Sequence, residues 1–574
     1  MRFETPMPSL PAETGTPVWA DAYVARLAAL DVAARHREME RFTFPRNIGT
    51  LLREAAAETP DTLAWNFFES GETITYAALD AAVDRMAAGL ATFGVSRGMK
   101  VGVMLPNCPQ MPIVWLALAR IGAVMVPVNL RYTGRELAYV LGDAGAEVLV
   151  IHDDCGAQYR EAVEVAEAGR FPRADRVLRM AGGAAQETLL PPGAVTLDAL
   201  DAGVADGARL DGPEPAHDDL MNIQYTSGTT GFPKGCMLTH RYWLGAGFVN
   251  GFRDARRFRR VLAATPFFYM DPQWLLLLCF YQRGTLFVAR RQSASRFAGW
   301  LRDYRINFCL FPEIVFKQPE TPEDGKTELM RANIYGHRKE INAALRKRFN
   351  APAMEAFGMT EVGPGLYMPL DALHMVGSGS CGIAAPFRQA RIVDEAGNDV
   401  SRGEIGELVL KGPGLMLGYY NRPEANRDSF FGEWFRTGDL FRQDAEGYFY
   451  IVGRLKDMVR RAGENIAARE VETVLRNMDE IEEVAVVPVP DDLRGEEVKA
   501  YVLPAAGIQR DDDLIGRILR HCEANLAAFK IPRYIAFVDD IPRTASQKVA
   551  KTALTAGIAD LRAGAFDRVE GYWR

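Results

Sequence analysis

The chain has 574 residues, of which 48% are hydrophobic and 25% charged, and its formal net charge is −7. This length exceeds what one hydrophobic core usually supports, so two or more domains are expected, and the composition excludes a disordered or fibrous protein. The acidic balance argues against a nucleic-acid partner, because such binding depends on a basic surface.

Cysteine usage and apolar runs indicate the compartment. The seven cysteines are scattered without a CxxC pair, which argues against a disulfide framework or a zinc site and favours a reducing cytoplasm. The N-terminal stretch MRFETPMPSLPAETG has charges and prolines where a signal peptide needs an apolar core. Arg120 interrupts the apolar stretch 113–130, and WLLLLCFY (274–281) is too short to cross a bilayer. We expect a cytoplasmic protein without an integral membrane segment, and residues 1–45 as a loosely attached extension.

Helices and strands alternate in the first part of the chain. The spacing of Leu79, Val83, Met86, Leu90 and Phe93 predicts a helix over 79–93. VGVML (101–105) then reads as a buried strand, and a helix over about 109–121 leads to a second strand, AVMVPV. This order predicts parallel strands covered by helices.

The pattern changes twice further on. Between about 380 and 455, short β-rich segments such as GEIGELVLKG predict antiparallel hairpins or a small barrel. After GRLKD (453–457) a helical stripe around Val471, the strands VAVVPVP and VKAYVLP, a helix near 512–528 and a strand around Tyr534 follow. The predicted fold class is α/β: an N-terminal domain (1–455) of α/β layers with a small β-barrel-like subdomain, and a small α+β C-terminal domain (456–574).

The stretch YTSGTTGFPKG (225–235) contains hydroxyls, glycines and one lysine, and almost nothing that can pack. Such a run is either a flexible linker or a loop that binds a polyanion through backbone N–H groups, hydroxyls and an ammonium. It does not match the Walker spacing. Because it follows the apolar strand MNIQY and precedes a segment that we expect to be helical, the polyanion loop is favoured.

This stretch closely resembles the phosphate-loop signature of the adenylate-forming superfamily, which includes acyl-CoA synthetases, luciferases and amino-acid adenylation domains. Further matches follow in the family's order: AFGMTEVG (356–363), WFRTGDL (434–440), GRLKDMVRRAGENI (453–466) and IPRTASQKVAK (541–551). The resemblance covers roughly residues 45–555. NCPQMPIVWLALARIGAVMVPVN, PFFYMDPQW and LAAFKIPRYI look most like the crotonobetaine/carnitine-CoA ligase branch.

The resemblance implies a nucleotide site. Phe357 would stack on adenine in place of the usual tyrosine, Thr360 would touch the α-phosphate, and Glu361 would help to hold Mg²⁺. Asp439 would accept the ribose hydroxyls, and Lys548 would be the adenylation lysine. The implied ATP- and AMP-binding set is Thr226, Ser227, Gly228, Thr229, Thr230, Gly231, Lys234, Gly336, Phe357, Gly358, Thr360, Asp439, Arg454 and Lys548, with Lys548, Thr360, Glu361 and Lys234 catalytic.

The resemblance also implies a mobile C-terminal domain that rotates about Lys456, with Gly463 near the path of coenzyme A. The acyl pocket would include Tyr269, Trp274, Tyr335 and His337, where a mixed aromatic and polar wall favours a small or medium acid over a long-chain fatty acid. A packed histidine or ordinary core residues would explain the same positions. Five arginines between Arg253 and Arg260 are interpreted as a solvated face rather than a grip on coenzyme A, and GSGSCG (377–382) as a structural turn.

The implied activity is an AMP-forming acyl-CoA ligase that uses ATP, Mg²⁺ and coenzyme A to activate a small-molecule carboxylic acid, with a homodimer as the expected assembly. A stand-alone enzyme that loads a carrier protein would share every motif. A luciferase-like oxygenase has no independent support, and a non-catalytic nucleotide-binding relative would not need Lys234, Thr360, Glu361, Asp439 and Lys548 together.

Overall fold

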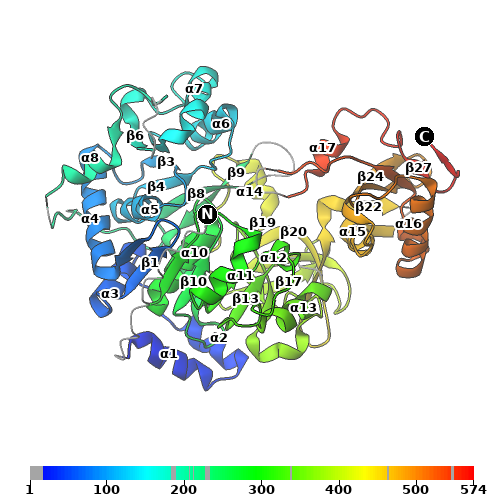
Figure 1. Cartoon of the computed structure of the whole chain (residues 1–574), viewed down its shortest axis with the longest axis horizontal. Coiled ribbons are helices and arrows are strands. Elements are labelled where there is room, and N and C mark those ends of the chain that lie inside the picture. The colour runs from blue at the N-terminus through cyan, green and yellow to red at the C-terminus, as the bar shows by residue number, and fades with distance from the viewer. Residues whose placement is uncertain are drawn as a thin grey trace.

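The computed structural model describes residues 17–182, 189–205, 207–210, 212–226, 233–335, 339–461, 464–544 and 548–574. A large body is formed by the chain up to about residue 455, and a smaller lobe, coloured orange to red in Figure 1, by the residues that follow. The predicted α/β class is therefore confirmed. The predicted division at Lys456 stays a prediction, although the hydrophobic core of the lobe draws its members from Val459 onward.

The first sheet of the body is mostly parallel, as the alternation of elements predicted. Its strand order is β7 (Val195–Thr196), β6 (Val177–Met180), β5 (Val148–His152), β3 (Lys100–Met104), β4 (Val124–Pro127), β8 (Leu220–Thr226) and β9 (Lys234–Thr239). The helices predicted here are α4 (Tyr76–Thr92) and α5 (Gln110–Ile121), which pack on one another. Arg120 of α5 is buried, and it pairs with Asp80 and Asp84 of α4.

One expectation about this sheet is wrong. The residue after the 225–235 stretch was expected to enter a helical segment, but Lys234 begins β9, which pairs antiparallel with β8 in the register Thr226 to Lys234. The loop therefore connects two strands of a hairpin, and the helix α9 (His240–Phe252) starts only after β9. KGCMLT forms a strand because its alternate residues Cys236 and Leu238 are buried against the core.

The second sheet lies beside the first and shares a hydrophobic core with it. Its order is β16 (Ile383–Ala384), β15 (Gly363–Tyr367), β14 (Ala353–Met359), β13 (Arg331–Ile334), β12 (Phe308–Leu310), β10 (Arg260–Ala263), β11 (Thr285–Val288), β1 (Leu63–Phe67) and β2 (Glu72–Thr75). The core combines residues of both sheets with α3 (Ile48–Glu58), α5, α9 and α10 (Met270–Gln282). Burial on every side explains why α10 contains the apolar run WLLLLCFY.

The β-rich segment between 380 and 455 forms an antiparallel sheet, as predicted. The order is β17 (Gln389–Val393), β18 (Gly406–Lys411), β20 (Trp434–Gln443) and β19 (Phe430–Phe431), and β21 (Phe449–Arg454) pairs with β20. GSGSCG leads into β16 and not into a helix, in agreement with a structural turn. β21 continues directly into the short 3-10 turn Leu455–Asp457 that contains Lys456.

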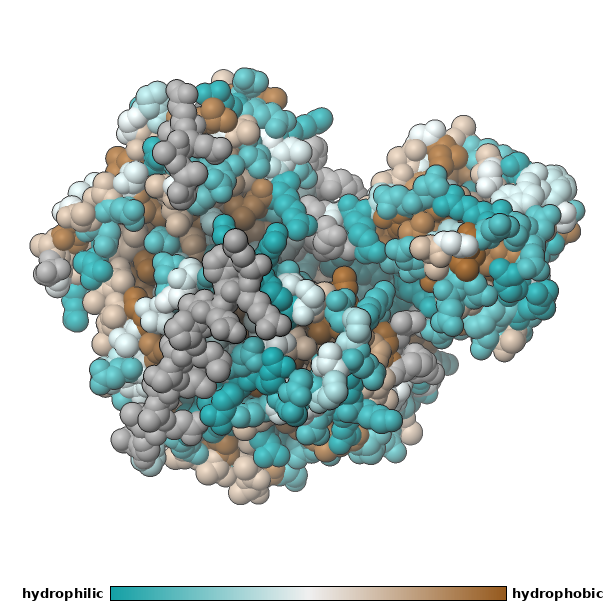
Figure 2. Space-filling model, in the orientation of Figure 1, coloured by the Kyte–Doolittle hydropathy of each residue, from teal (hydrophilic) through white to brown (hydrophobic). Residues whose placement is uncertain are grey.

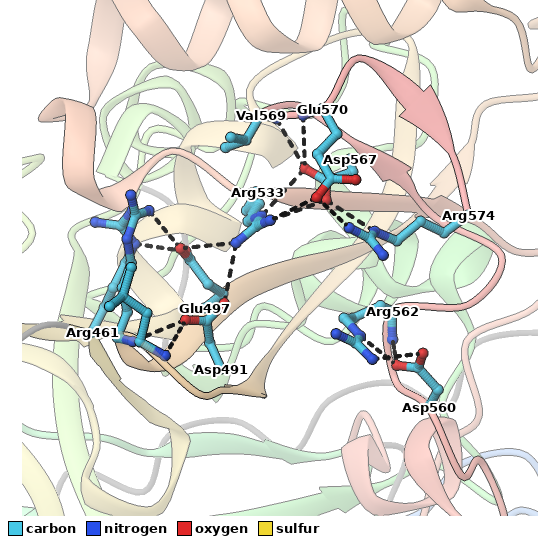
Figure 3. A network of polar contacts seen from close by, with 12 residues as sticks. Arg461, Asp491, Glu497, Arg533, Asp560, Arg562, Asp567, Val569, Glu570 and Arg574 are labelled. Atoms are coloured by element: carbon cyan, nitrogen blue, oxygen red, sulfur yellow. Dashed lines mark hydrogen bonds and ion pairs between the residues drawn. The ribbon is translucent and has the colours of Figure 1, made fainter.

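The lobe is an α+β unit. Its sheet order is β23 (Glu464–Ala467), β22 (Met458–Arg461), β25 (Gly495–Pro504), β26 (Tyr534–Phe537), β27 (Phe566–Asp567) and β28 (Tyr572–Trp573), with β24 (Ile481–Asp491) paired to β25. The helices α15 (Ala468–Arg476) and α16 (Asp512–Asn525) contribute to its core. Figure 3 shows how an ion-pair network ties the last strands to the sheet: Arg533 lies between Glu497, Asp491 and the buried Asp567.

Residues 17–45 are not a loose extension, which corrects the expectation made from sequence. Two helices, α1 (Trp19–Ala28) and α2 (Val32–Glu40), pack on the body, and Ala20, Leu27 and Met39 have no exposed surface. Arg35 adds an ion pair of 2.9 Å with Asp371. The segment stays attached because its apolar side chains complete the core next to α9.

On the face shown in Figure 2, hydrophilic and hydrophobic residues alternate over both the body and the lobe. Within the described ranges, no helix has both the length and the apolar character needed to cross a bilayer.

Candidate active site

A cavity of about 1540 Å³ lies between the two sheets of the body and the start of the lobe. It brings together most of the predicted site residues, although they come from distant parts of the sequence. Those that line it are Thr226, Lys234, Tyr269, Trp274, Tyr335, Phe357, Gly358, Thr360, Glu361, Asp439, Arg454, Lys456 and Lys548. The predicted residues Ser227, Gly228, Thr229, Thr230, Gly231, Gly336, His337 and Gly463 lie outside the described residues.

Tyr419 organises one end of the cavity. Its ring lies under the ammonium of Lys234, with Nζ 4.1 Å from the ring centroid, and its hydroxyl donates a 2.8 Å hydrogen bond to Glu361 Oε1. A cation–π contact and a charge-assisted hydrogen bond thus hold a cation and a carboxylate on the same aromatic side chain. Sequence reasoning missed Tyr419. The available signal was the aromatic pair Tyr419–Tyr420 directly before the polar residues Asn421 and Arg422.

The carboxylate of Glu361 is the candidate magnesium ligand. Glu361 is 7% exposed and follows Thr360 in the turn between β14 and β15. The described residues contain no group of three or more side chains that could hold a metal on their own. This donor set fits Mg²⁺ that takes one protein carboxylate and obtains its other oxygens from phosphates and water.

Asp439 presents an unused acceptor to the cavity. It is 1% exposed, and its Oδ1 lies 2.9 Å from Arg454 Nε, while its buried Oδ2 has no hydrogen-bond partner. Gly438 beside it has φ +68°, a left-handed conformation that favours glycine. Burial raises the pKa of Asp439 to about 6, against the opposing charges of Arg454, Arg469 and Lys548. A buried acceptor of this kind fits a ligand hydroxyl, as the ribose of a nucleotide would supply.

Lys548 is contributed by the lobe, close in space to Glu361 and Asp439. Burial is the largest effect that lowers the pKa of Lys548, and the positive charge of Arg454 lowers it further, whereas Glu361 and Asp439 act in the opposite direction. The loop that carries it is anchored on both sides. Arg543 pairs with Glu483 at 2.8 Å before the loop, and Lys551 pairs with Glu472 at 2.7 Å after it.

The far end of the cavity has aromatic and polar walls. Tyr269 and Trp274 flank the start of α10, Tyr335 follows β13, and Phe357 meets Phe441 edge-on with ring centroids 5.1 Å apart. Sequence reasoning placed the first three in an acyl pocket, and all three line the cavity. Phe357, expected to stack on adenine, also lines it.

The interpretation of the arginine run as a solvated face is wrong for Arg253. This residue is 1% exposed, lines the cavity and donates from Nη2 to Asn333 Oδ1 at 3.1 Å. It follows the last turn of α9, which points inward, next to the buried ion pair of Arg331 and Asp254. Arg256 remains exposed and Arg257 pairs with Asp21 at 2.6 Å.

The fold and the cavity define a class of protein in which a large body and a smaller lobe both contribute side chains to one cavity. The family comparison agrees: residues 52–420 match the model of the AMP-binding enzyme family, and residues 470–548 match the AMP-binding enzyme C-terminal domain. The chain belongs to the AMP-binding enzyme family, within the adenylate-forming superfamily.

Individual relatives cover nearly the whole chain. A crotonobetaine/carnitine–CoA ligase of Proteus mirabilis (strain HI4320) is 31% identical over 87% of this chain and 97% of the relative. A feruloyl-CoA synthase of an Amycolatopsis species is 34% identical over 84% and 93%. Among solved structures, ATP-bound MatB from Rhodopseudomonas palustris has a TM-score of 0.76 and 27% identity, covering 88% of this chain and 98% of that chain.

Proposed function

We propose that the protein is an ATP-dependent, AMP-forming acyl-CoA ligase for a small or medium carboxylic acid. The observation that carries the proposal is that Lys548 of the lobe lines the same cavity as Lys234, Glu361 and Asp439 of the body. Family membership supports it, as do the relatives named as CoA ligases.

The reaction explains why these groups are needed. A carboxylate resists nucleophiles because it is negative and lacks a good leaving group. Its attack on the α-phosphorus of ATP releases pyrophosphate and gives an acyl-adenylate, which a thiol can then attack. The enzyme must hold two anions together and stabilise charge on the phosphorus oxygens, so positioning and electrostatics dominate.

Each site residue receives one role in this proposal. Lys234 would bind phosphate oxygens, Thr360 would contact the α-phosphate, and Lys548 would neutralise the charge that develops during adenylation. Glu361 would hold Mg²⁺, which when bound neutralises phosphate charge and orients the pyrophosphate.

The nucleoside would be held by three further residues. Asp439, with Arg454 beside it, would accept the ribose hydroxyls. Phe357 would offer its ring face to adenine.

The second half-reaction requires the lobe to move. We infer that residues 1–455 and 456–574 act as separate bodies that rotate about Lys456, which withdraws Lys548 and opens a path for coenzyme A past Gly463. Lys456 and Asp457 line the cavity, so a change at this turn alters the site directly. A homodimer is proposed as the assembly, to be checked by light scattering of the purified chain.

The deciding experiment incubates the purified protein with ATP, Mg²⁺, coenzyme A and a panel of carboxylic acids, and detects new thioesters by mass spectrometry. We expect a thioester and AMP to form in equal amounts. Replacing coenzyme A by a phosphopantetheinylated carrier protein tests the other acceptor. If no acid supports pyrophosphate exchange into ATP, the proposed function is wrong.

A further inference from the structure

A carboxylate lies in the wall of the cavity where the acyl pocket is expected. Asp271 is in the first turn of α10, and its side chain is partly exposed to the cavity. Trp274, one turn later, donates its Nε1–H to Asp271 Oδ1 at 3.2 Å. This bond fixes the orientation of the carboxylate on a rigid helix, with aromatic surface on the same wall.

The negative charge of Asp271 has no cation to balance it in the part of the chain that the structure describes. The ion pairs there include none to Asp271, and Trp274 is its single hydrogen-bond donor. Burial raises the pKa of Asp271 to about 6, and the bond from Trp274 opposes this shift. Buried carboxylates are normally paired or accept several hydrogen bonds, so this one has an unmet demand for a donor.

Two neutral side chains that line the cavity also have an acceptor oxygen without a hydrogen-bond donor. Gln224 Nε2 donates to the carbonyl oxygen of Phe268 at 2.7 Å, and Asn250 Nδ2 donates to that of Ala246 at 3.0 Å. Because a carbonyl oxygen can only accept, these bonds fix which end of each amide is the oxygen. The oxygens Gln224 Oε1 and Asn250 Oδ1 are buried without donors. The lining of the cavity thus contains two further buried acceptors without donors.

The donors nearest in character to a possible partner of Asp271 are directed elsewhere in part. Arg253 also lines the cavity. Its Nη2 donates to Asn333, and its Nε makes no hydrogen bond but lies 3.8 Å from Asp254 Oδ2, so its charge is balanced by Asp254 and not by Asp271. The hydroxyl of Tyr335 accepts from Asn333 Nδ2 at 3.4 Å and keeps its own O–H, which makes no hydrogen bond to Asp271 in this structure. An acid in the first turn of a helix also stabilises the helix dipole. That role does not require a position on the cavity wall.

We propose that Asp271 is a specificity residue that accepts a hydrogen bond from a hydroxyl or amino group on the acyl part of the substrate. The substrate class is then a carboxylic acid that carries a hydrogen-bond donor on a tail bounded by Tyr269 and Trp274. This inference rests on the proposed function and narrows it. A site built to bind a donor discriminates strongly against an analogue that lacks it, because the buried acceptor is left unpaired.

The test uses acids of equal size on an alkyl and a phenyl skeleton, each ending in a methyl, hydroxyl, amino or trimethylammonium group. Adenylation is followed by pyrophosphate exchange. For the native protein, we expect kcat/KM for the hydroxyl or amino acid to exceed that for the methyl acid by ~10-fold or more. A trimethylammonium acid that is preferred to both would overturn the claim, because it has charge but no donor.

Variants separate recognition from folding. Asp271→Asn and Asp271→Leu should each lower the ratio of kcat/KM between donor and methyl acids by ~10-fold or more. Asp198→Asn, at an exposed acid in the first turn of α8 (Leu197–Ala202), is the matched control and should leave the ratio unchanged. Calorimetric binding of AMP confirms that each variant is folded.

The experiment distinguishes a failure of the Asp271 inference from a failure of the proposed ligase function. If acids are activated but the ratio does not respond to either Asp271 variant, the inference is wrong while the ligase activity stands. If no acid in any series supports exchange, the proposed function fails and this inference fails with it.

Discussion

The hydroxyl of Tyr419 donates a 2.8 Å hydrogen bond to the Glu361 carboxylate, which joins two segments that sequence reasoning treated separately. Glu361 follows β14, and Tyr419 lies in the turn after β18. The backbone strengthens the same junction, because the amide of Met416 donates to the carbonyl oxygen of Glu361 at 2.9 Å. The candidate magnesium ligand is therefore positioned by a neighbouring sheet.

Tyr419→Phe should weaken the use of magnesium while keeping the ring under Lys234. A hydrogen bond to a charged group contributes about 1.5–3 kcal/mol, so we expect a loss of ~10-fold or more in kcat/KM for adenylation. The measurement is the adenylation rate against Mg²⁺ concentration, with half-saturation moving upward. Tyr420→Phe, on the neighbouring ring, is the control. An unchanged magnesium dependence would show that the bond does not position Glu361.

Lys548→Ala should separate the two half-reactions. Removing one group that stabilises transition-state charge typically costs about 10²–10³-fold, and we expect this loss in adenylate formation. Thioester formation from supplied acyl-AMP and coenzyme A should remain largely intact, because we propose that the lysine is withdrawn at that stage. Single-turnover kinetics of each half-reaction test this. Equal losses in both, in a folded variant, would contradict the assigned role.

Lys456→Pro should impair the thioester step more than adenylation. Proline fixes φ near −65° and thereby restricts rotation at the pivot. In this structure Lys548 already lines the cavity, and Lys551 pairs with Asp457 at 3.3 Å, so we expect the adenylation step to be affected less. The two half-reaction rates are compared as above. Unchanged rates for both steps would place the pivot elsewhere.

Nucleoside binding should depend on pH through Asp439. Its pKa is raised to about 6, so the carboxylate becomes protonated as the pH falls through 6 and loses its pairing with Arg454. We expect affinity for adenosine, which has no phosphate to titrate, to increase between about pH 5 and pH 7. Titration calorimetry measures it, and Asp439→Asn should give a weaker, flat profile.

The raised pKa of Asp439 also makes the free energy of unfolding depend on pH. This contribution to stability decreases as the pH rises, whereas the expected affinity for adenosine increases. A raised pKa means that the folded chain holds a proton more tightly than the unfolded chain, so this contribution is fully present below the usual carboxyl pKa and is lost as the pH rises through 6. Denaturant unfolding of the native protein and Asp439→Asn should therefore differ in slope against pH between about 4 and 6. Parallel slopes would indicate that another group titrates.

Arg533→Ala should destabilise the lobe. Asp567 and Glu497 are almost completely buried, and removing one partner of a buried ion pair costs about 3–5 kcal/mol. Arg574 still contacts Asp567 at 2.9 Å, so we expect the lower end of this range. Hydrogen exchange of the β26 amides measures the free energy of opening. Arg562→Ala is the control, because it removes an exposed ion pair with Asp560 (Figure 3). We expect this variant to leave the hydrogen exchange of the β26 amides unchanged.

Local sequence patterns were sufficient to predict much of the fold. The helical spacing from Leu79 to Phe93 reflects burial of one helix face, and the apolar run VGVML reflects a strand that is buried on both faces; the structure confirms both elements. The motif residues Glu361, Asp439 and Lys548 could be named from sequence because each lies in a segment that resembles a known signature. The structure then places all three on one cavity.

The predictions that the structure corrected concern residues whose surroundings are formed by distant segments of the chain. Arg253 lies in an arginine-rich run that is typical of a solvated face, and only the burial of the end of α9 beside Arg331 and Asp254 reverses that interpretation. The segment around Trp19 lacks a strong hydrophobic pattern of its own, yet the ring of Trp19 packs on Phe42 and Phe252. Tyr419 contacts Glu361, which lies far from it in the sequence, so no local spacing reveals the pair.

The order in which the cavity is encoded has a consequence during synthesis on the ribosome. Lys234, Glu361 and Asp439 all precede residue 455, whereas Lys548 belongs to the lobe, whose hydrophobic core draws its members from Val459 onward. Domains generally fold as units, N-terminal first, as the nascent polypeptide emerges. A ribosome-bound intermediate would thus acquire its nucleotide pocket before it could activate any acid, so translation itself delays the onset of catalysis until the final segment has been released.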